Sequence, residues 1–130
     1  MIGLDLDHIA LAVPSLSEAI ALHESLTGGS GTEPETLTDQ GVRVAFVGPI
    51  ELLEPLHPDT PVGRFLSRRG AGFHHIAYRA PDLARELARL TTAGYEAIDR
   101  TPRPGARGHL VAFLHPRTTG GILIELVERR

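Results

Sequence analysis

The chain has 130 residues, 42% of them hydrophobic and 22% charged, and a formal net charge of −3 at pH 7. This composition is typical of a globular protein and excludes a disordered chain, and the acidic balance offers no basic stripe for nucleic acid. The chain lacks Cys, and it also lacks a signal-peptide pattern and a run of about 20 apolar residues. We therefore expect no disulfide, no membrane span and a cytoplasmic location.

All 13 basic residues are Arg, since the sequence contains no Lys. This excludes Schiff-base chemistry and a lysine base, and the Arg guanidinium is too basic to exchange protons near neutral pH. Any proton transfer therefore falls to His, Asp, Glu or Tyr.

In chain order, the first half is expected to hold a strand at 7–13, a helix at 15–26, a weak edge segment at 30–40, and strands at 41–47 and 50–53. Alternation along the first strand places His8 on one face with Ala10 and Ala12. Glu51 lies among apolar residues, which is unusual for a carboxylate unless it is paired or binds a metal. Glu54 lies on the opposite face and is expected to be solvated.

A linker at 55–61 leads into a short connecting helix at 60–70, which has Pro at its first helical position. The second half then repeats the order of elements, with a strand at 75–80, a helix at 82–94, a short strand at 95–98, a loop at 101–108, and strands at 111–114 and 122–127.

The two halves are related by an internal repeat. The nine residues from 8 to 16 return as residues 75 to 83, at an offset of 67, with five identical positions. The other repeated pairs are 44–47 with 111–114, and 50–54 with 124–128. A repeat of this kind predicts two copies of one small module, each with an early strand His and a late strand Glu.

Each half reads strand–helix–strand–strand–strand, so the predicted fold class is α+β. Two βαβββ modules would form one curved eight-stranded sheet, with the helices outside and a cleft inside. We expect a single domain over residues 1–130, made of module 1 at about 5–56, the connecting helix at about 60–70 and module 2 at about 72–128.

The repeat relates His8 to His75 and Glu51 to Glu125. A pseudo-two-fold axis would bring these four residues to one point, where two imidazoles and two carboxylates suit Zn²⁺, Co²⁺, Mn²⁺, Ni²⁺ or Fe²⁺. Two carboxylates favour a site that keeps positions open for water or substrate. Each residue alone could be a hydrogen-bonded core His or an edge Glu facing water, but the matched set favours a metal site. The neighbouring His74 points to the other face and is structural or a dimer contact.

The chain resembles the vicinal oxygen chelate superfamily, and within it the methylmalonyl-CoA epimerases. The resemblance covers almost the whole chain. The stretches that carry it are DHIA at 7–10, AVP at 12–14, IELLEPL at 50–56, GFHHIA at 72–77, PRPGA at 102–106, VAFLHP at 111–116 and TGGILIEL at 119–126. The His-Pro, Gly-Gly and Glu run near the C-terminus is particular to the epimerases.

This resemblance implies that His8, Glu51, His75 and Glu125 bind a divalent ion, which would be Co²⁺, Zn²⁺, Mn²⁺ or Ni²⁺. Some epimerases have Gln in the position of Glu51. The implied reaction is epimerisation of methylmalonyl-CoA at C2, in which the ion stabilises the enediolate that forms when the α-proton leaves. The substrate is then a small acyl-CoA, and the family suggests a homodimer.

Glu125 is the candidate catalytic base, because a carboxylate held at the metal sits beside the α-carbon of the substrate. Some family members carry a second Glu where this chain has Val44, which cannot transfer protons. The second acid or base stays open among Glu51, a His, a Tyr and a water. His109 stands where the family often has Lys, and it is otherwise a solvated loop residue. Four arginines are candidates for the CoA phosphates or are simply solvated: Arg68, Arg69, Arg103 and Arg107.

Other functions remain possible on this fold. A glyoxalase I-like lyase or a thiol transferase resembles the epimerases in its metal chemistry, and only substrate tests separate them. An extradiol dioxygenase fits less well, because its iron binds two His and one carboxylate and needs the position that a fourth ligand would fill. A metal-free drug-binding protein of the bleomycin-resistance type usually lacks the four ligands, and metal content distinguishes it.

Overall fold

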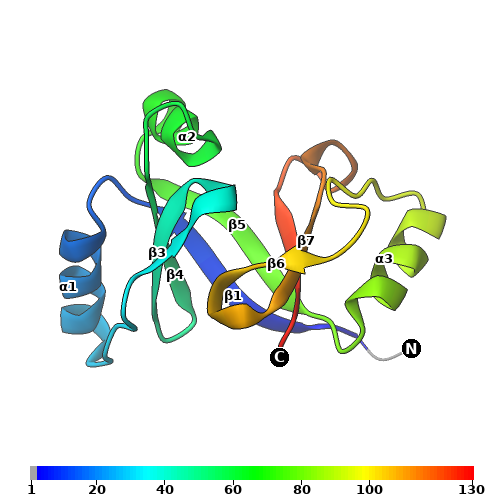
Figure 1. The fold of residues 1–130 in the computed structure, drawn as a ribbon, viewed down its shortest axis with the longest axis horizontal. Helices are drawn as coiled ribbons and strands as arrows, with labels where there is room; N and C mark the ends of the chain where they lie inside the picture. Colours follow the sequence, from blue (N-terminus) through cyan, green and yellow to red (C-terminus); the bar gives the residue numbers. More distant parts are fainter. Residues whose placement is uncertain (1–2) are drawn as a thin grey trace. The chain divides into compact units, whose positions relative to one another are not determined.

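The computed structural model describes residues 3–130. Its strands and α-helices are, in chain order, β1 Asp5–Ala12, α1 Leu16–Thr27, β2 Glu35–Leu37, β3 Val42–Val47, β4 Ile50–Pro55, α2 Pro61–Arg69, β5 Gly72–Arg79, α3 Leu83–Thr92, β6 Arg103–Pro104, β7 Leu110–Leu114 and β8 Ile124–Glu128 (Figure 1). The strands form one eight-stranded sheet in the order β2-β3-β4-β1-β5-β8-β7-β6. The predicted α+β class, with four strands from each half of the chain, is confirmed. None of the described helices is long and apolar enough to cross a membrane.

The chain divides into two compact units. One unit is formed by residues 3–8 together with 75–130, and the other by residues 9–74. The boundaries fall inside β1 and β5. The single domain and the module bounds expected from the sequence stay predictions.

In the unit of residues 9–74, α1 covers one face of the strands, beside β3 and β4 (Figure 1). The buried residues between helix and strands are Leu16, Ala19, Ala45, Val47 and Leu52, with Leu11 and Val13 packed against them. Ala10 and Ala12 are fully buried, and alternation places them on the opposite face of β1 from Leu11 and Val13. The strand faces predicted from the sequence are therefore confirmed.

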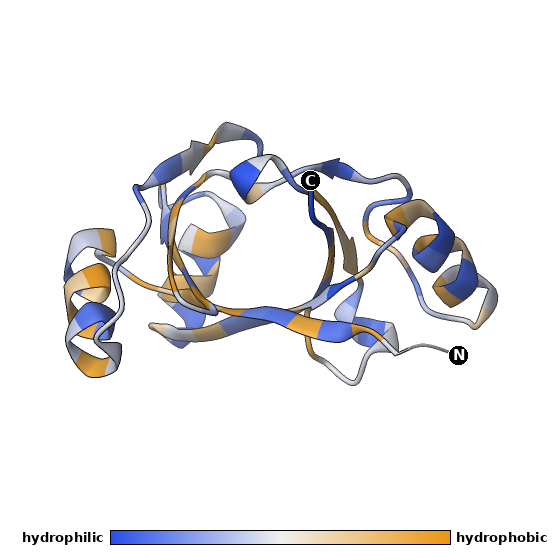
Figure 2. Cartoon of the chain, turned by 90° about the horizontal axis from the view of Figure 1, so that it is seen from below, coloured by the Kyte–Doolittle hydropathy of each residue, from blue (hydrophilic) through white to orange (hydrophobic). Residues whose placement is uncertain are grey.

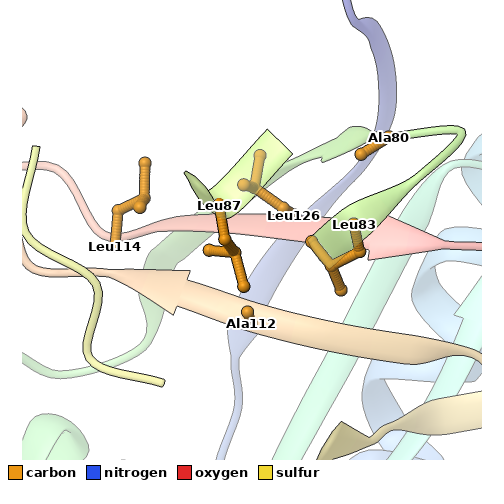
Figure 3. Packing of buried hydrophobic residues seen from close by; sticks show 6 residues of the cluster. All are labelled: Ala80, Leu83, Leu87, Ala112, Leu114 and Leu126. Carbon is orange, nitrogen blue, oxygen red and sulfur yellow. The ribbon is translucent and has the colours of Figure 1, made fainter. Parts of the chain in front are cut away.

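The other unit follows the same plan with α3. Leu83 and Leu87 of this helix pack against Ala112, Leu114 and Leu126 of the strands (Figure 3). Hydrophobic and hydrophilic residues alternate around α3 (Figure 2), as expected for a helix with one buried face. The smaller cluster of Ala77, Val111 and Val127 lies on the opposite face of the strands. Each unit thus leaves one strand face uncovered by its helix.

A carboxylate from the last strand of each half caps the helix of that half. The Leu16 N–H donates to Glu54 Oε2 at 2.9 Å, and the Leu83 N–H donates to Glu128 Oε1 at 2.9 Å. These bonds satisfy amides at the helix N-termini and place negative charge where the helix dipole favours it. The sequence-based expectation that Glu54 is solvated was wrong, because the repeat-related pair Glu54 and Glu128 serves the two helices.

Replacing this cap should destabilise the fold without touching the candidate site. We expect Glu54→Ala to lower the free energy of unfolding by about 1 kcal/mol, because an amide of the first helical turn loses its acceptor. Urea unfolding of the variant measures this, with the exposed Glu33→Ala as the matched control. Equal unfolding free energies for the two variants would contradict a capping role for Glu54.

The predicted strand at 95–98 is reduced to an isolated bridge between Ala97 and Leu114. The Asp99 carboxylate interrupts further pairing, because its Oδ2 accepts the Phe113 N–H at 2.9 Å in place of a backbone carbonyl. The edge of the sheet is instead the two-residue strand β6, which lies inside the segment 101–108 that the sequence predicted as a loop.

Candidate metal centre

Three of the four predicted ligands lie together in the unit that contains β8. His8 Nε2 is 3.0 Å from Glu125 Oε1, and His75 Nε2 is 3.3 Å from the same oxygen. The two imidazole rings meet edge to face, with centroids 5.7 Å apart. Each residue offers one ligand atom, and these atoms lie within 4.8 Å of one another. Two imidazole nitrogens thus converge on one carboxylate oxygen.

Strand register explains the positions of His75 and Glu125. The parallel strands β5 and β8 pair Ala77 with Glu125, and His75 lies two residues before Ala77 on the same face. On the other side of β8, β7 pairs Phe113 with Glu125. The Phe113 ring meets the His75 ring edge to face at 5.2 Å, so an aromatic wall fixes the imidazole from the side.

Glu51 has the same strand neighbours in the unit of residues 9–74. The parallel strands β1 and β4 pair it with Ala10, and the antiparallel strands β3 and β4 pair it with Phe46. Glu125 likewise lies between an Ala and a Phe. Ala10 follows His8 by two residues on β1, as Ala77 follows His75 on β5. Glu51 is therefore equivalent to Glu125 in local structure as well as in sequence.

The burial of these side chains is what makes a metal site the best account of them. The four residues are between 3% and 5% exposed: His8, Glu51, His75 and Glu125. Burying a carboxylate costs free energy unless a charge, hydrogen bonds or a metal compensates it. Imidazole nitrogens and carboxylate oxygens are donors that suit divalent first-row metals, so the residues present fit such an ion.

Asp7 contacts His8 on the side away from Glu125. The distance from His8 Nδ1 to Asp7 Oδ2 is 2.7 Å, and the Asp7 side chain is only 6% exposed. Asp7 Oδ1 accepts from Arg129 Nε at 2.8 Å and from Arg79 Nε at 3.3 Å. Burial by itself would raise the pKa of Asp7, but the hydrogen bonds from His8 and Arg129 outweigh it and hold the pKa well below its usual range. This role of Asp7 was not predicted from the sequence, where the available signal is an acid directly before the first strand His.

Strand pairing relates Arg103, one of the four candidate phosphate-binding arginines, to the strand face that carries Glu125. Arg103 pairs with Val111 across β6 and β7, two residues before Phe113. Its guanidinium carbon lies 5.8 Å from the centre of the Phe113 ring, and its Nε is 3.1 Å from Asp99 Oδ1. Arg103 is therefore held at the edge of the strand face that carries Glu125.

The remaining candidate arginines have other surroundings. Arg68 and Arg69 end α2, where the Arg69 guanidinium lies 5.6 Å from the centre of the Phe65 ring. Arg107 has a backbone φ of 61°, the left-handed conformation that side chains other than Gly seldom adopt. None of these three is placed near Glu125 by strand pairing among the described residues.

Two histidines outside the candidate centre have structural contacts. His109 Nδ1 accepts the backbone N–H of Arg130 at 2.9 Å, and burial together with the Arg129 charge lowers the pKa of His109. His109 lies in a loop and is partly exposed, so the structure agrees with the expected loop residue and adds a backbone contact to it. His74 packs edge to face on Phe65 with ring centroids 5.0 Å apart, which supports the structural interpretation of this residue.

Comparison with known proteins identifies the family of this chain. Residues 7–113 match the family model of the glyoxalase/bleomycin resistance protein/dioxygenase superfamily. The chain is 42% identical to the uncharacterized protein YqjC of Bacillus subtilis, with 95% of this chain and 91% of that protein covered. It is 39% identical to an ethylmalonyl-CoA/methylmalonyl-CoA epimerase of Cereibacter sphaeroides, with 98% of this chain and 99% of that enzyme covered.

A solved structure shares the fold of the whole chain. A variant of Streptomyces coelicolor methylmalonyl-CoA epimerase, in complex with 2-nitronate-propionyl-CoA, superposes with a TM-score of 0.92 at 31% identity, over 98% of this chain and 96% of that one. The predicted vicinal oxygen chelate fold is thereby confirmed. The chain belongs to the glyoxalase/bleomycin resistance protein/dioxygenase superfamily, and methylmalonyl-CoA epimerases are among its close homologues and structural neighbours.

Proposed function

We propose that this chain epimerises methylmalonyl-CoA at C2, with a divalent metal ion bound by His8, Glu51, His75 and Glu125. The observation that carries the proposal is the buried approach of both His8 Nε2 and His75 Nε2 to Glu125 Oε1. The acyl-CoA is supported by the homologous epimerases and by the propionyl-CoA analogue bound to the Streptomyces enzyme. The burial and register of Glu51, which match those of Glu125, support it as the fourth ligand.

When bound, Co²⁺, Zn²⁺, Mn²⁺ or Ni²⁺ would supply Lewis-acid stabilisation of the negative charge that develops on the substrate thioester oxygen. The protein supplies the proton transfer. The Glu125 carboxylate takes the proton from C2, and a second group returns one to the opposite face of the same carbon. Glu51 is the repeat-related carboxylate for that second role. Val44, which packs in the core at 1% exposure, has no group that transfers protons.

The apolar walls of the candidate centre favour this chemistry. Ala77, Val111 and Val127 form a buried cluster beside Glu125 in the sheet. Apolar neighbours exclude water from the carboxylate and strengthen electrostatic interactions with the substrate.

Arg103 is proposed to bind an anionic group of the acyl-CoA. We expect Arg103→Gln to raise KM for methylmalonyl-CoA by about 10–100-fold with little change in kcat, because a charge-assisted hydrogen bond is worth roughly 1.5–3 kcal/mol. Steady-state kinetics measure the change, and Arg117→Gln is the matched control because Arg117 pairs with Glu96 on the surface. An unchanged KM for Arg103→Gln would assign this arginine to the Asp99 ion pair alone.

The test of the proposed function starts from one pure stereoisomer of methylmalonyl-CoA. The metal-loaded protein should convert it to the other isomer. A coupling enzyme that consumes only the product isomer measures this conversion. Conversion of a hemithioacetal with no conversion of methylmalonyl-CoA would favour the glyoxalase I-like lyase instead.

The homodimer and the cytoplasmic location expected from the sequence also stay proposals, and size-exclusion chromatography with light scattering tests the dimer.

A further inference from the structure

We propose that Asp7 is a positioning residue that fixes the orientation and the protonated nitrogen of the His8 imidazole. The inference rests on the proposed function, because it assumes that His8 Nε2 binds the metal. Asp7 is not one of the four proposed ligands and acts on the site through His8.

A short hydrogen bond joins the neighbouring side chains of Asp7 and His8. A carboxylate accepts hydrogen bonds and cannot donate them, so the 2.7 Å contact places a proton on His8 Nδ1. A neutral imidazole protonated at Nδ1 carries its lone pair on Nε2, which is the nitrogen that lies 3.0 Å from Glu125 Oε1. Asp7 thus selects the tautomer in which Nε2 is able to bind a metal.

Asp7 is itself held by side chains from the ends of two other strands. Arg79 is the last residue of β5, the strand of His75, and Arg129 directly follows β8, the strand of Glu125. Both guanidinium groups donate to Asp7 Oδ1, so Asp7 links β1 to the ends of β5 and β8. Each of these strands, β1, β5 and β8, carries one of the three clustered ligands.

The Asp7 carboxylate is both charged and buried. A carboxylate whose side chain is 6% exposed requires compensation, and two arginines and an imidazole provide it. A solvent-exposed carboxylate would not need this arrangement. The Asp5 side chain, two residues earlier on β1, is exposed to solvent.

The experiment compares metal affinity and the His8 tautomer in four variants. Zn²⁺ affinity is measured by competition with a chromophoric chelator, and nitrogen-15 histidine spectra of the zinc-loaded protein report the His8 Nδ1 proton. We expect Asp7→Ala to weaken Zn²⁺ binding about 10–100-fold and to expose the Nδ1 proton to solvent exchange. Asp7→Asn should restore most of the affinity, because its amide oxygen still accepts from Nδ1.

The other two variants separate positioning from a general effect on stability. Arg129→Gln should weaken Zn²⁺ binding by less than Asp7→Ala, because Arg79 still holds the Asp7 carboxylate. Asp5→Ala should leave both the affinity and the Nδ1 proton unchanged. If the wild-type protein binds no Zn²⁺, the proposed function fails. If the wild type binds Zn²⁺ and Asp7→Ala binds it equally well, or if Asp7→Asn rescues nothing, the positioning role of Asp7 is overturned.

Discussion

Replacement of His75 by Ala is expected to abolish epimerisation and stoichiometric metal binding together. The variant removes one of the two imidazole nitrogens that approach Glu125 Oε1. Stabilisation of an oxyanion by a bound metal is worth several kcal/mol, so its loss should lower kcat/KM by roughly a thousandfold or more. Metal content by mass spectrometry and turnover of methylmalonyl-CoA measure the two effects on one sample.

The matched control for this change is the preceding residue. His74→Ala removes an imidazole that packs on Phe65 and takes no part in the candidate centre. We expect this control to keep its metal and most of its activity. Because His75 is buried, a loss of activity has to be separated from unfolding. Thermal melting measures the stability of His75→Ala, and His75→Gln is a second variant that fills more of the space of the imidazole. Full activity in a folded His75→Ala protein would contradict a metal-centred mechanism.

Replacement of Glu125 by Gln is expected to give the second largest loss. The amide oxygen of Gln can still approach the ion, but the side chain no longer accepts a proton from C2 of the substrate. General base catalysis contributes typically about 10²–10⁴-fold, and we expect a loss of that size in the rate of C2 proton exchange. Proton exchange in metal-reconstituted protein is the measurement, because it separates proton transfer from metal loss.

Glu128→Gln is the control for the Glu125 variant. Glu128 lies three residues further along the chain and accepts the Leu83 N–H at the start of α3. Its replacement should leave proton exchange near the wild-type rate. Wild-type exchange in metal-loaded Glu125→Gln would remove Glu125 from the role of base and leave it as a ligand only.

The internal repeat explains why so much of this molecule could be predicted from one sequence. Matching positions in the two halves predicted the strands of His8 and His75, the late strands of Glu51 and Glu125, and the faces on which these side chains lie. Alternation was decisive, because a shift by one residue would turn every side chain to the other face. The register with Ala10 and Ala77 agrees with that prediction.

The parts that the sequence did not predict depend on contacts between distant residues. The carboxylate of Asp99 accepts the Phe113 N–H and ends strand pairing at 95–98, and no local sequence pattern predicts this contact. The capping of α1 by Glu54 links positions 38 residues apart. Asp7 was passed over because its partners, Arg79 and Arg129, are far along the chain and become neighbours only in the folded protein.

The most direct test of the central proposal is proton exchange at C2 of methylmalonyl-CoA in D₂O, followed by NMR with and without a chelator. The proposed mechanism predicts exchange far above the background rate in the metal-loaded protein, and its loss when the chelator removes the ion. Absence of exchange in a folded, metal-loaded sample would contradict the epimerase proposal.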